Sequence, residues 1–226
     1  MSSTTTRHDL VAVDLHRGGT SVARTVTALA TAVGAGVALG VLDLRWNLRA
    51  PSAWATVANS AAGWATAAFL LAFVLRTGPV RSALAGVVML AVAVEAYYAA
   101  AAYWHVGSTE VLTSSTAQYW LLLSVATGIV FGVAGSMAAS RSRVIAAVGF
   151  AAGASLCLGD ALQLWRQSGA SSYGGAHDEA VALAIVGLSV LALALRRPLI
   201  ALAAAALSLP MAVIVSHVFV AAQISL

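Results

Sequence analysis

The sequence predicts an all-α protein, a polytopic membrane helix bundle with about seven transmembrane helices and a cytoplasmic N-terminus. Hydrophobic residues make up 61% of its 226 residues and charged residues only 9%, whereas roughly a quarter of the residues in a soluble domain are charged. Most of the chain consists of apolar runs of about 20 residues, the length that a helix needs to cross a bilayer. In lipid every backbone polar group needs an internal partner, so we expect each run to be a helix.

The apolar runs follow one another with short connections. Their approximate limits are Thr25–Leu42, Ala53–Leu75, Ser82–Trp104, Tyr119–Ala139, Val144–Trp165, Ala180–Leu195 and Leu199–Ala221. The sixth run holds only about 16 apolar residues, so we expect this helix to be short or to begin within the membrane interface.

The first 24 residues differ in composition from the rest of the chain. They are polar and contain no apolar segment followed by a small-residue cleavage site, so we expect no removable signal peptide. We therefore predict a disordered cytoplasmic tail at residues 1–24 and one transmembrane domain at residues 25–226.

The basic residues set the orientation. Nine arginines fall on one side of the predicted membrane, in the tail and in three tight connections: Arg7, Arg17, Arg24, Arg76, Arg81, Arg141, Arg143, Arg196 and Arg197. Only Arg45, Arg49 and Arg166 fall on the other side. The positive-inside rule then places the N-terminus in the cytoplasm and the C-terminus outside, and we expect a multi-pass protein of the bacterial plasma membrane.

Composition also excludes several functions. There is no lysine, so the chain cannot hold retinal as a Schiff base. Cys157 is the only cysteine, which excludes a disulfide framework and a thiolate metal cluster. The candidate metal ligands come singly from different helices, so we predict no metal and no cofactor. The basic pI near 9.8 reflects membrane topology, and no nucleic acid is expected as a partner.

Three ionisable residues lie inside predicted spans, where an Asp costs roughly 2.5–3.5 kcal/mol at a helix centre. Glu95, Asp160 and His217 lie on the third, fifth and seventh helices, past the midpoint of each. All three helices run outward, so these residues share the outer half of the membrane. Glu95 and Tyr98 share a face of small residues, which suits the interior of the bundle. The alternative for Glu95 is a structural hydrogen bond.

Polar and aromatic residues on neighbouring helices fall at the same depth and predict an outward-facing pocket. The ligand-binding residues would be Asn59, Trp64, Tyr97, Tyr98, Gln163 and His217. The alternatives are an interfacial aromatic belt and an interfacial histidine.

Small residues recur at four-residue spacing on the first helix, at Ala28, Ala32, Gly36 and Gly40. Such a face lets another helix backbone approach closely. It would either dock a partner membrane subunit or pack within the bundle, and the abundance of Ala and Gly in the chain favours packing.

Three stretches of the chain resemble a functionally uncharacterised family of small bacterial polytopic membrane proteins. They are ANSAAGWATAAFLLAFVLR, GVVMLAVAVEAYYAAAAYW, and ATGIVFGVAGS followed by CLGDALQLW. The resemblance covers roughly residues 39 to 195. It implies that Asn59, Ser60 and Trp64 form a motif of the second helix, that Tyr97 and Tyr98 form a tyrosine pair, and that Asp160 matches an acidic position. Glu95 departs from the glycine expected there. The resemblance implies no activity.

Two function classes fit these features, beside a structural or assembly role without a ligand. The first is a solute-binding, transport-associated subunit, similar in plan to the substrate-capturing components of energy-coupling uptake transporters. Asn59, Tyr98 and Asp160 would hydrogen-bond the solute, and Trp64 and Tyr97 would stack on it.

The second is an intramembrane enzyme acting on a lipophilic substrate, such as a polyprenyl cyclase or isomerase. Glu95 and Asp160 would then be its catalytic acid and base, held in an apolar pocket.

Overall fold

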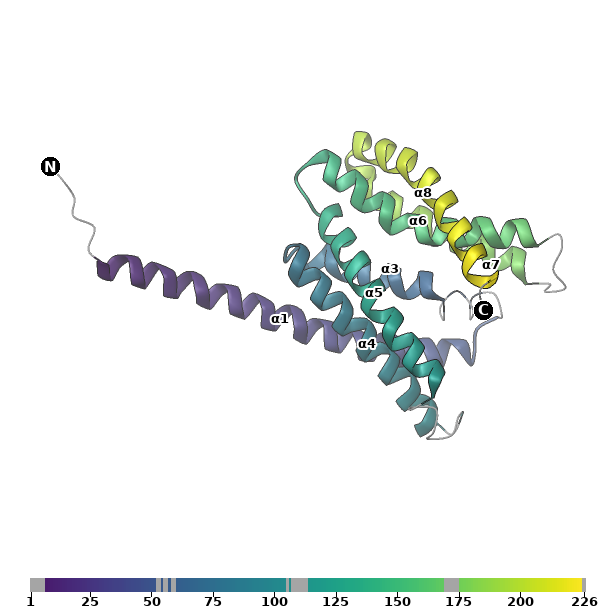
Figure 1. The fold of residues 1–226 in the computed structure, drawn as a ribbon, viewed down its shortest axis with the longest axis horizontal. Coiled ribbons are helices and arrows are strands. Elements are labelled where there is room, and N and C mark those ends of the chain that lie inside the picture. Colours follow the sequence, from purple (N-terminus) through teal and green to yellow (C-terminus); the bar gives the residue numbers. More distant parts are fainter. Residues whose placement is uncertain are drawn as a thin grey trace.

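The computed structural model describes residues 7–51, 54, 57, 60–104, 106, 114–168 and 175–224, and the side chains of those between 22 and 217. In this part of the chain there are seven α-helices, one short 3₁₀ helix and no strand (Figure 1). The helices are α1 Arg7–Asn47, α3 Ala61–Leu75, α4 Pro79–Tyr103, α5 Ser115–Ala138, α6 Arg143–Gln167, α7 Ala176–Ala192, η2 Leu193–Arg196 and α8 Pro198–Ile224. Six helices are long and apolar enough to cross a membrane. The predicted all-α, multi-pass membrane bundle is confirmed.

The helices form two groups that share a central contact. In the first group α4 packs between α1 and α5, and α3 packs on α4 and α5. In the second group α6 packs on α7 and α8 (Figure 1). Contacts of α6 with α3 and α5 join the two groups. We call the end of the bundle at the C-terminus of α1 the outer end, following the predicted orientation, and the opposite end the inner end.

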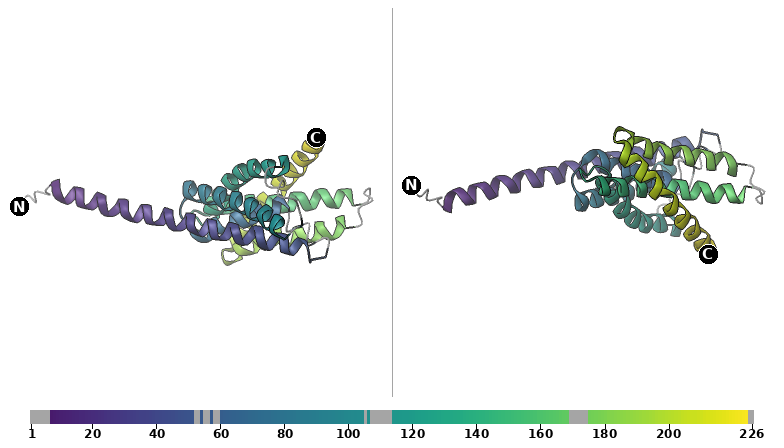
Figure 2. Two further views of the ribbon diagram at one scale, coloured as in Figure 1. Left: turned by 90° about the horizontal axis from the view of Figure 1, so that it is seen from below. Right: turned by 90° about the horizontal axis from the view of Figure 1, so that it is seen from above.

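The N-terminal part of α1 extends beyond the rest of the bundle (Figures 1 and 2). Helix α1 begins at Arg7, so it includes most of the segment 1–24 for which we expected a disordered tail. The segment contains no proline, the residue that disfavours a helix most. The division of the chain into a tail and one transmembrane domain stays a prediction.

The shortest of the described α-helices is α3, which corresponds to the second predicted span, whereas we expected the sixth span to be short. Helix α7 begins at Ala176 and continues through η2, which gives a span of 21 residues, Ala176–Arg196. Helix α3 begins only at Ala61 and has 15 residues, a rise of about 22 Å. The Ser60 side chain caps α3 by accepting a hydrogen bond from the backbone N–H of Gly63 at 3.0 Å.

The small-residue stripe on α1 packs against α4. Ala28 and Ala32 are buried. A Cβ atom on Gly36 would lie 2.5 Å from the Met89 carbonyl oxygen, and one on Gly40 would lie 2.2 Å from that of Ala93. The stripe therefore packs within the bundle, and docking of a partner subunit stays a prediction.

The core of the inner half is centred on Phe69 of α3, which is fully buried. Its ring stacks on Phe73, with centroids 6.2 Å apart, and contacts Phe150 of α6 at 6.2 Å. Gly153 of α6 and Gly135 of α5 let α3 approach closely, because a Cβ on either glycine would lie within 3 Å of Phe69 atoms. The three rings hold α3 and α6 together.

Arginines from separate connections meet at the inner end. Arg76 ends α3 in the left-handed conformation, with φ 52°. Arg197 follows η2, and its Nη1 donates to the carbonyl oxygen of Ser140 at 3.3 Å, in the turn between α5 and α6. Arg76, Arg196 and Arg197 line one cavity. These connections thus lie at one end of the bundle, as the distribution of arginines predicts.

Candidate functional site

Four aromatic side chains from three helices meet in the outer half of the bundle. They are Trp64 of α3, Tyr97 and Tyr98 of α4, and Trp120 of α5, and we call them the aromatic cluster. The Trp64 ring centroid lies 6.4 Å from that of Tyr97 and 6.4 Å from that of Trp120. Tyr97 and Tyr98 meet edge to face at 5.4 Å. The structure therefore brings together Trp64, Tyr97 and Tyr98, three of the predicted ligand-binding residues.

A cavity of about 240 Å³ lies against this cluster. All four rings line it, together with Val94 and Thr116. Trp64 is 9% exposed and Val94 is buried, while the tyrosines and Trp120 are half-buried. The cavity thus presents aromatic surface, one aliphatic side chain and a few hydroxyl groups to whatever enters it.

A buried carboxylate positions one of the rings. Asp43 on α1 is only 4% exposed, and its Oδ2 accepts a hydrogen bond from the Trp64 indole Nε1 at 3.1 Å. Its Oδ1 is buried without a hydrogen-bond partner in the described part of the chain. One turn later, Asn47 Nδ2 donates to the Tyr97 hydroxyl at 3.4 Å. The last turns of α1 thus hold two of the four rings.

The sequence prediction missed Asp43 and Asn47 because it ended the first span at Leu42. A signal was present, since Asp43 and Asn47 continue the face of Gly36 and Gly40 at helical spacing. The face that packs on α4 therefore changes from small to polar residues at the outer end.

A second polar cluster lies on the opposite face of α3. Here Thr66 Oγ1 is 3.2 Å from Sγ of the buried Cys157 on α6. Gln163 of α6 and Glu179 of α7 are also buried. The Asp160 carboxyl on α6 repels the Glu179 carboxyl electrostatically. Asp160 and Gln163, predicted to share the aromatic pocket, are not among the described residues that line its cavity.

The remaining predicted residues lie apart from the cluster. Glu95 is exposed on the outside of α4, so the expectation that it faces the bundle interior is wrong. Helix α4 uses its other faces to pack on α1, α3 and α5, which leaves the Glu95 face uncovered. His217 of α8 is also exposed. Asn59 lies outside the described residues.

The proposed catalytic pair is not assembled in this arrangement. Glu95 is exposed on α4. Asp160 is on α6, which packs mainly on α5, α7 and α8, and its carboxyl interacts with that of Glu179 on α7. Among the described residues, no group of three or more His, Cys, Asp and Glu side chains could hold a metal ion. Catalytic roles for Glu95 and Asp160 stay predictions.

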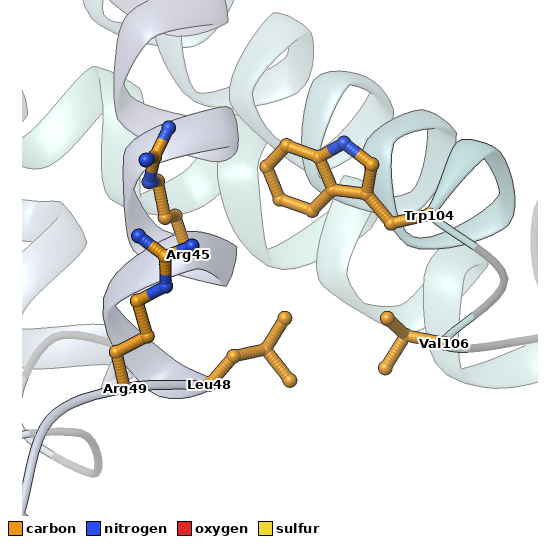
Figure 3. A pocket seen from close by; sticks show the side chains of 5 residues that line it. All are labelled: Arg45, Leu48, Arg49, Trp104 and Val106. Atoms are coloured by element: carbon orange, nitrogen blue, oxygen red, sulfur yellow. The ribbon is translucent and has the colours of Figure 1, made fainter.

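Another cavity, of about 380 Å³, lies at the outer end between α1 and the end of α4. Figure 3 shows the Arg45 and Arg49 side chains on one side and the Trp104 indole on the other, with Leu48 and Val106 below them. Arg45 lies within α1, one turn before Arg49, so both guanidinium groups extend from the same face. This cavity is wider and more exposed to solvent than the one at the aromatic cluster.

Comparison with known proteins gives one match. The model of a family described as a family of unknown function, DUF6518, matches residues 19–224. No curated protein and no solved structure matches the chain.

Proposed function

The chain belongs to the DUF6518 family of unknown function, and we propose that it is a solute-binding, transport-associated membrane protein whose site is the cavity at the aromatic cluster. The observation that carries this proposal is the convergence of Trp64, Tyr97, Tyr98 and Trp120 on one cavity. An interfacial aromatic belt needs no such convergence, because belt residues point outward to the lipid headgroups.

The volume of the cavity limits the size of the solute. About 240 Å³ equals the liquid volume of roughly eight water molecules. Drug-sized ligands occupy sites of about 300–1,000 Å³. We therefore propose a small organic solute that enters from the outer side.

The chemistry of the lining favours a solute with a cationic group. Aromatic ring faces attract cations, most strongly when water is excluded, and Trp is the best of the aromatic residues. The Asp43 carboxylate accepts the Trp64 N–H, which adds negative charge behind that ring and increases the attraction. Asp43 does not line the cavity, so we assign it as a positioning residue.

The outer location of the cluster and the orientation of the arginines fit capture of a solute from outside the plasma membrane. In this proposal a partner membrane subunit would supply the energy for transport. The enzyme alternative receives no such support, because the pair Glu95 and Asp160 is not assembled.

The test is calorimetric titration of the purified chain in neutral detergent with tetramethylammonium, choline and the neutral tert-butyl analogue of choline. We expect the two cations to bind and the neutral analogue to bind more weakly. Trp120→Ala should weaken cation binding about three- to thirtyfold, because it removes one ring face. Trp165→Ala is the matched control, since Trp165 is exposed at the outer end and outside the cluster.

Equal affinities for the cations and the neutral analogue would overturn the cationic class of solute. Equal losses in Trp120→Ala and Trp165→Ala would overturn the site itself. The Asp43→Asn variant separates the two roles of the carboxylate, because Asn still accepts the Trp64 N–H but carries no charge.

A further inference from the structure

The largest cavity described above lies at the inner end, about 520 Å³ in volume, and is independent of the aromatic cluster. Its mouth is formed by the guanidinium groups of Arg76, Arg196 and Arg197, and its floor includes Phe73, Phe150 and Ile200. Ile200 and Phe150 are buried in the core around Phe69. The cavity therefore combines a cationic mouth with an apolar floor.

The positive charge at the mouth has no counter-charge in the described residues. The three arginines are exposed. In the described part of the chain the Arg197 guanidinium donates a hydrogen bond to the Ser140 carbonyl oxygen, an uncharged acceptor that leaves the positive charge in place. The acidic residues whose side chains are described lie in the outer halves of their helices: Asp43, Glu95, Asp160, Asp178 and Glu179. Three uncompensated guanidinium groups around one cavity attract anions strongly.

We propose that this inner arginine cavity binds a phosphate-bearing anion, with the phosphate between the guanidinium groups and any attached alkyl group on the apolar floor. Arginine presents its N–H donors in a planar fork that matches phosphate oxygens. The positive-inside rule accounts for arginines on this side of the membrane, but it does not require arginines from two separate connections, Arg76 after α3 and Arg196 and Arg197 before α8, to surround a single cavity.

The phosphate has two sources, a phospholipid headgroup or a soluble phosphate compound. In the predicted orientation the cavity opens toward the cytoplasmic leaflet, where anionic lipids are concentrated. The aromatic floor residues Phe73 and Phe150 lie where the first carbons of an acyl chain would enter. The same guanidinium chemistry would hold either ligand, so the experiment includes both.

The test is native mass spectrometry and fluorescence titration of the purified full chain in neutral detergent. The probes are short-chain phosphatidylglycerol, short-chain phosphatidylcholine and inorganic phosphate. We expect phosphatidylglycerol to bind more tightly than phosphatidylcholine, whose headgroup carries no net charge. If inorganic phosphate binds as tightly as the lipid, the ligand is soluble and the anion site is supported; if neither anion binds, the proposal is overturned.

Variants locate the site. Arg196→Gln should weaken phosphatidylglycerol binding roughly tenfold, because a charge-assisted hydrogen bond to phosphate is lost. Arg143→Gln is the matched control, since Arg143 is exposed at the same end and does not line the cavity. Equal losses in the two variants would mean diffuse attraction between the lipid and the whole inner surface, and would overturn a defined site. Protection of the buried Cys157 from alkylation shows that each variant is folded.

Discussion

The hydrogen bond between Asp43 and Trp64 makes a sharp prediction about stability. Asp43 Oδ2 has the Trp64 indole as its donor at 3.1 Å, and Oδ1 is buried without a hydrogen-bond partner in the described chain. Trp64→Phe keeps an aromatic ring but removes the indole N–H, so Oδ2 loses its donor and neither carboxylate oxygen then has a hydrogen bond in the described chain. Leaving a buried acceptor unsatisfied costs about 1–3 kcal/mol. For a chain of this length that corresponds to a fall of about 2–12 °C in Tm.

The partner variant should behave differently. Asp43→Leu keeps the branch at Cγ and removes a carboxylate that is only partly hydrogen-bonded, so its cost is smaller than that of Trp64→Phe. In the double variant neither group is left unsatisfied, and the free energy of unfolding should resemble that of Asp43→Leu alone. The double-mutant cycle should then show a coupling energy equal in size to the cost of Trp64→Phe, about 1–3 kcal/mol.

The single cysteine supplies the assay. Cys157 is fully buried on α6, and its Sγ contacts Thr66 of α3 rather than either changed side chain, so its alkylation reports separation of α3 from α6. We would measure alkylation rates over a denaturant series for the parent, both single variants and the double variant. Additive losses, or Asp43→Leu costing more than Trp64→Phe, would refute the assignment of Asp43 as the positioning residue of the indole.

Three further predictions follow from the packing and the topology. Gly135→Ala should destabilise the protein by about 1–3 kcal/mol, because its Cβ would lie 2.2 Å from the Phe69 carbonyl oxygen. Gly34→Ala is the control, since its Cβ would have nothing within 4 Å, and it should be neutral or stabilising by up to about 1 kcal/mol. The cysteine alkylation assay compares the two variants, and equal costs would contradict the contact between α5 and α3. Glu95→Gln should leave cation affinity unchanged, since Glu95 is exposed, and a calorimetric loss would place Glu95 in the site after all. If α3 crosses the membrane together with the six longer helices, as the sequence predicts, protease access to terminal tags should find the two termini on opposite sides; termini on one side would mean that α3 does not cross.

The fold could be predicted because a bilayer leaves few choices. A long apolar run must become a helix, and arginines mark its inner end. The length of α3 could not be predicted in the same way, since the apolar run from Ala53 to Leu75 continues past the point where Ser60 caps the helix. A side-chain cap decides that boundary, and hydropathy does not register it.

The candidate site was predicted in part. Trp64, Tyr97 and Tyr98 were found from their shared depth, which follows from position along each helix. The face of a helix is harder to predict where several faces are small and apolar. Helix α4 is contacted by three other helices, and alanines lie one helical turn before and after Glu95, at Ala91 and Ala99, so composition does not distinguish its uncovered face. Asp43 was lost for a different reason, because a charged residue after an apolar run was assigned to a loop.

The aromatic cluster, with its positioning residues, is drawn entirely from α1, α3, α4 and α5, between Asp43 and Trp120. A chain emerging from the ribosome presents these four helices before α6, α7 and α8 are made, and domains generally fold in that N-terminal order during synthesis. The last three helices contribute no side chain to the cavity lining. The cluster and its cavity can thus be assembled while the chain is still being translated, and a change of sequence in the C-terminal helices would leave the described lining of the cavity unaltered.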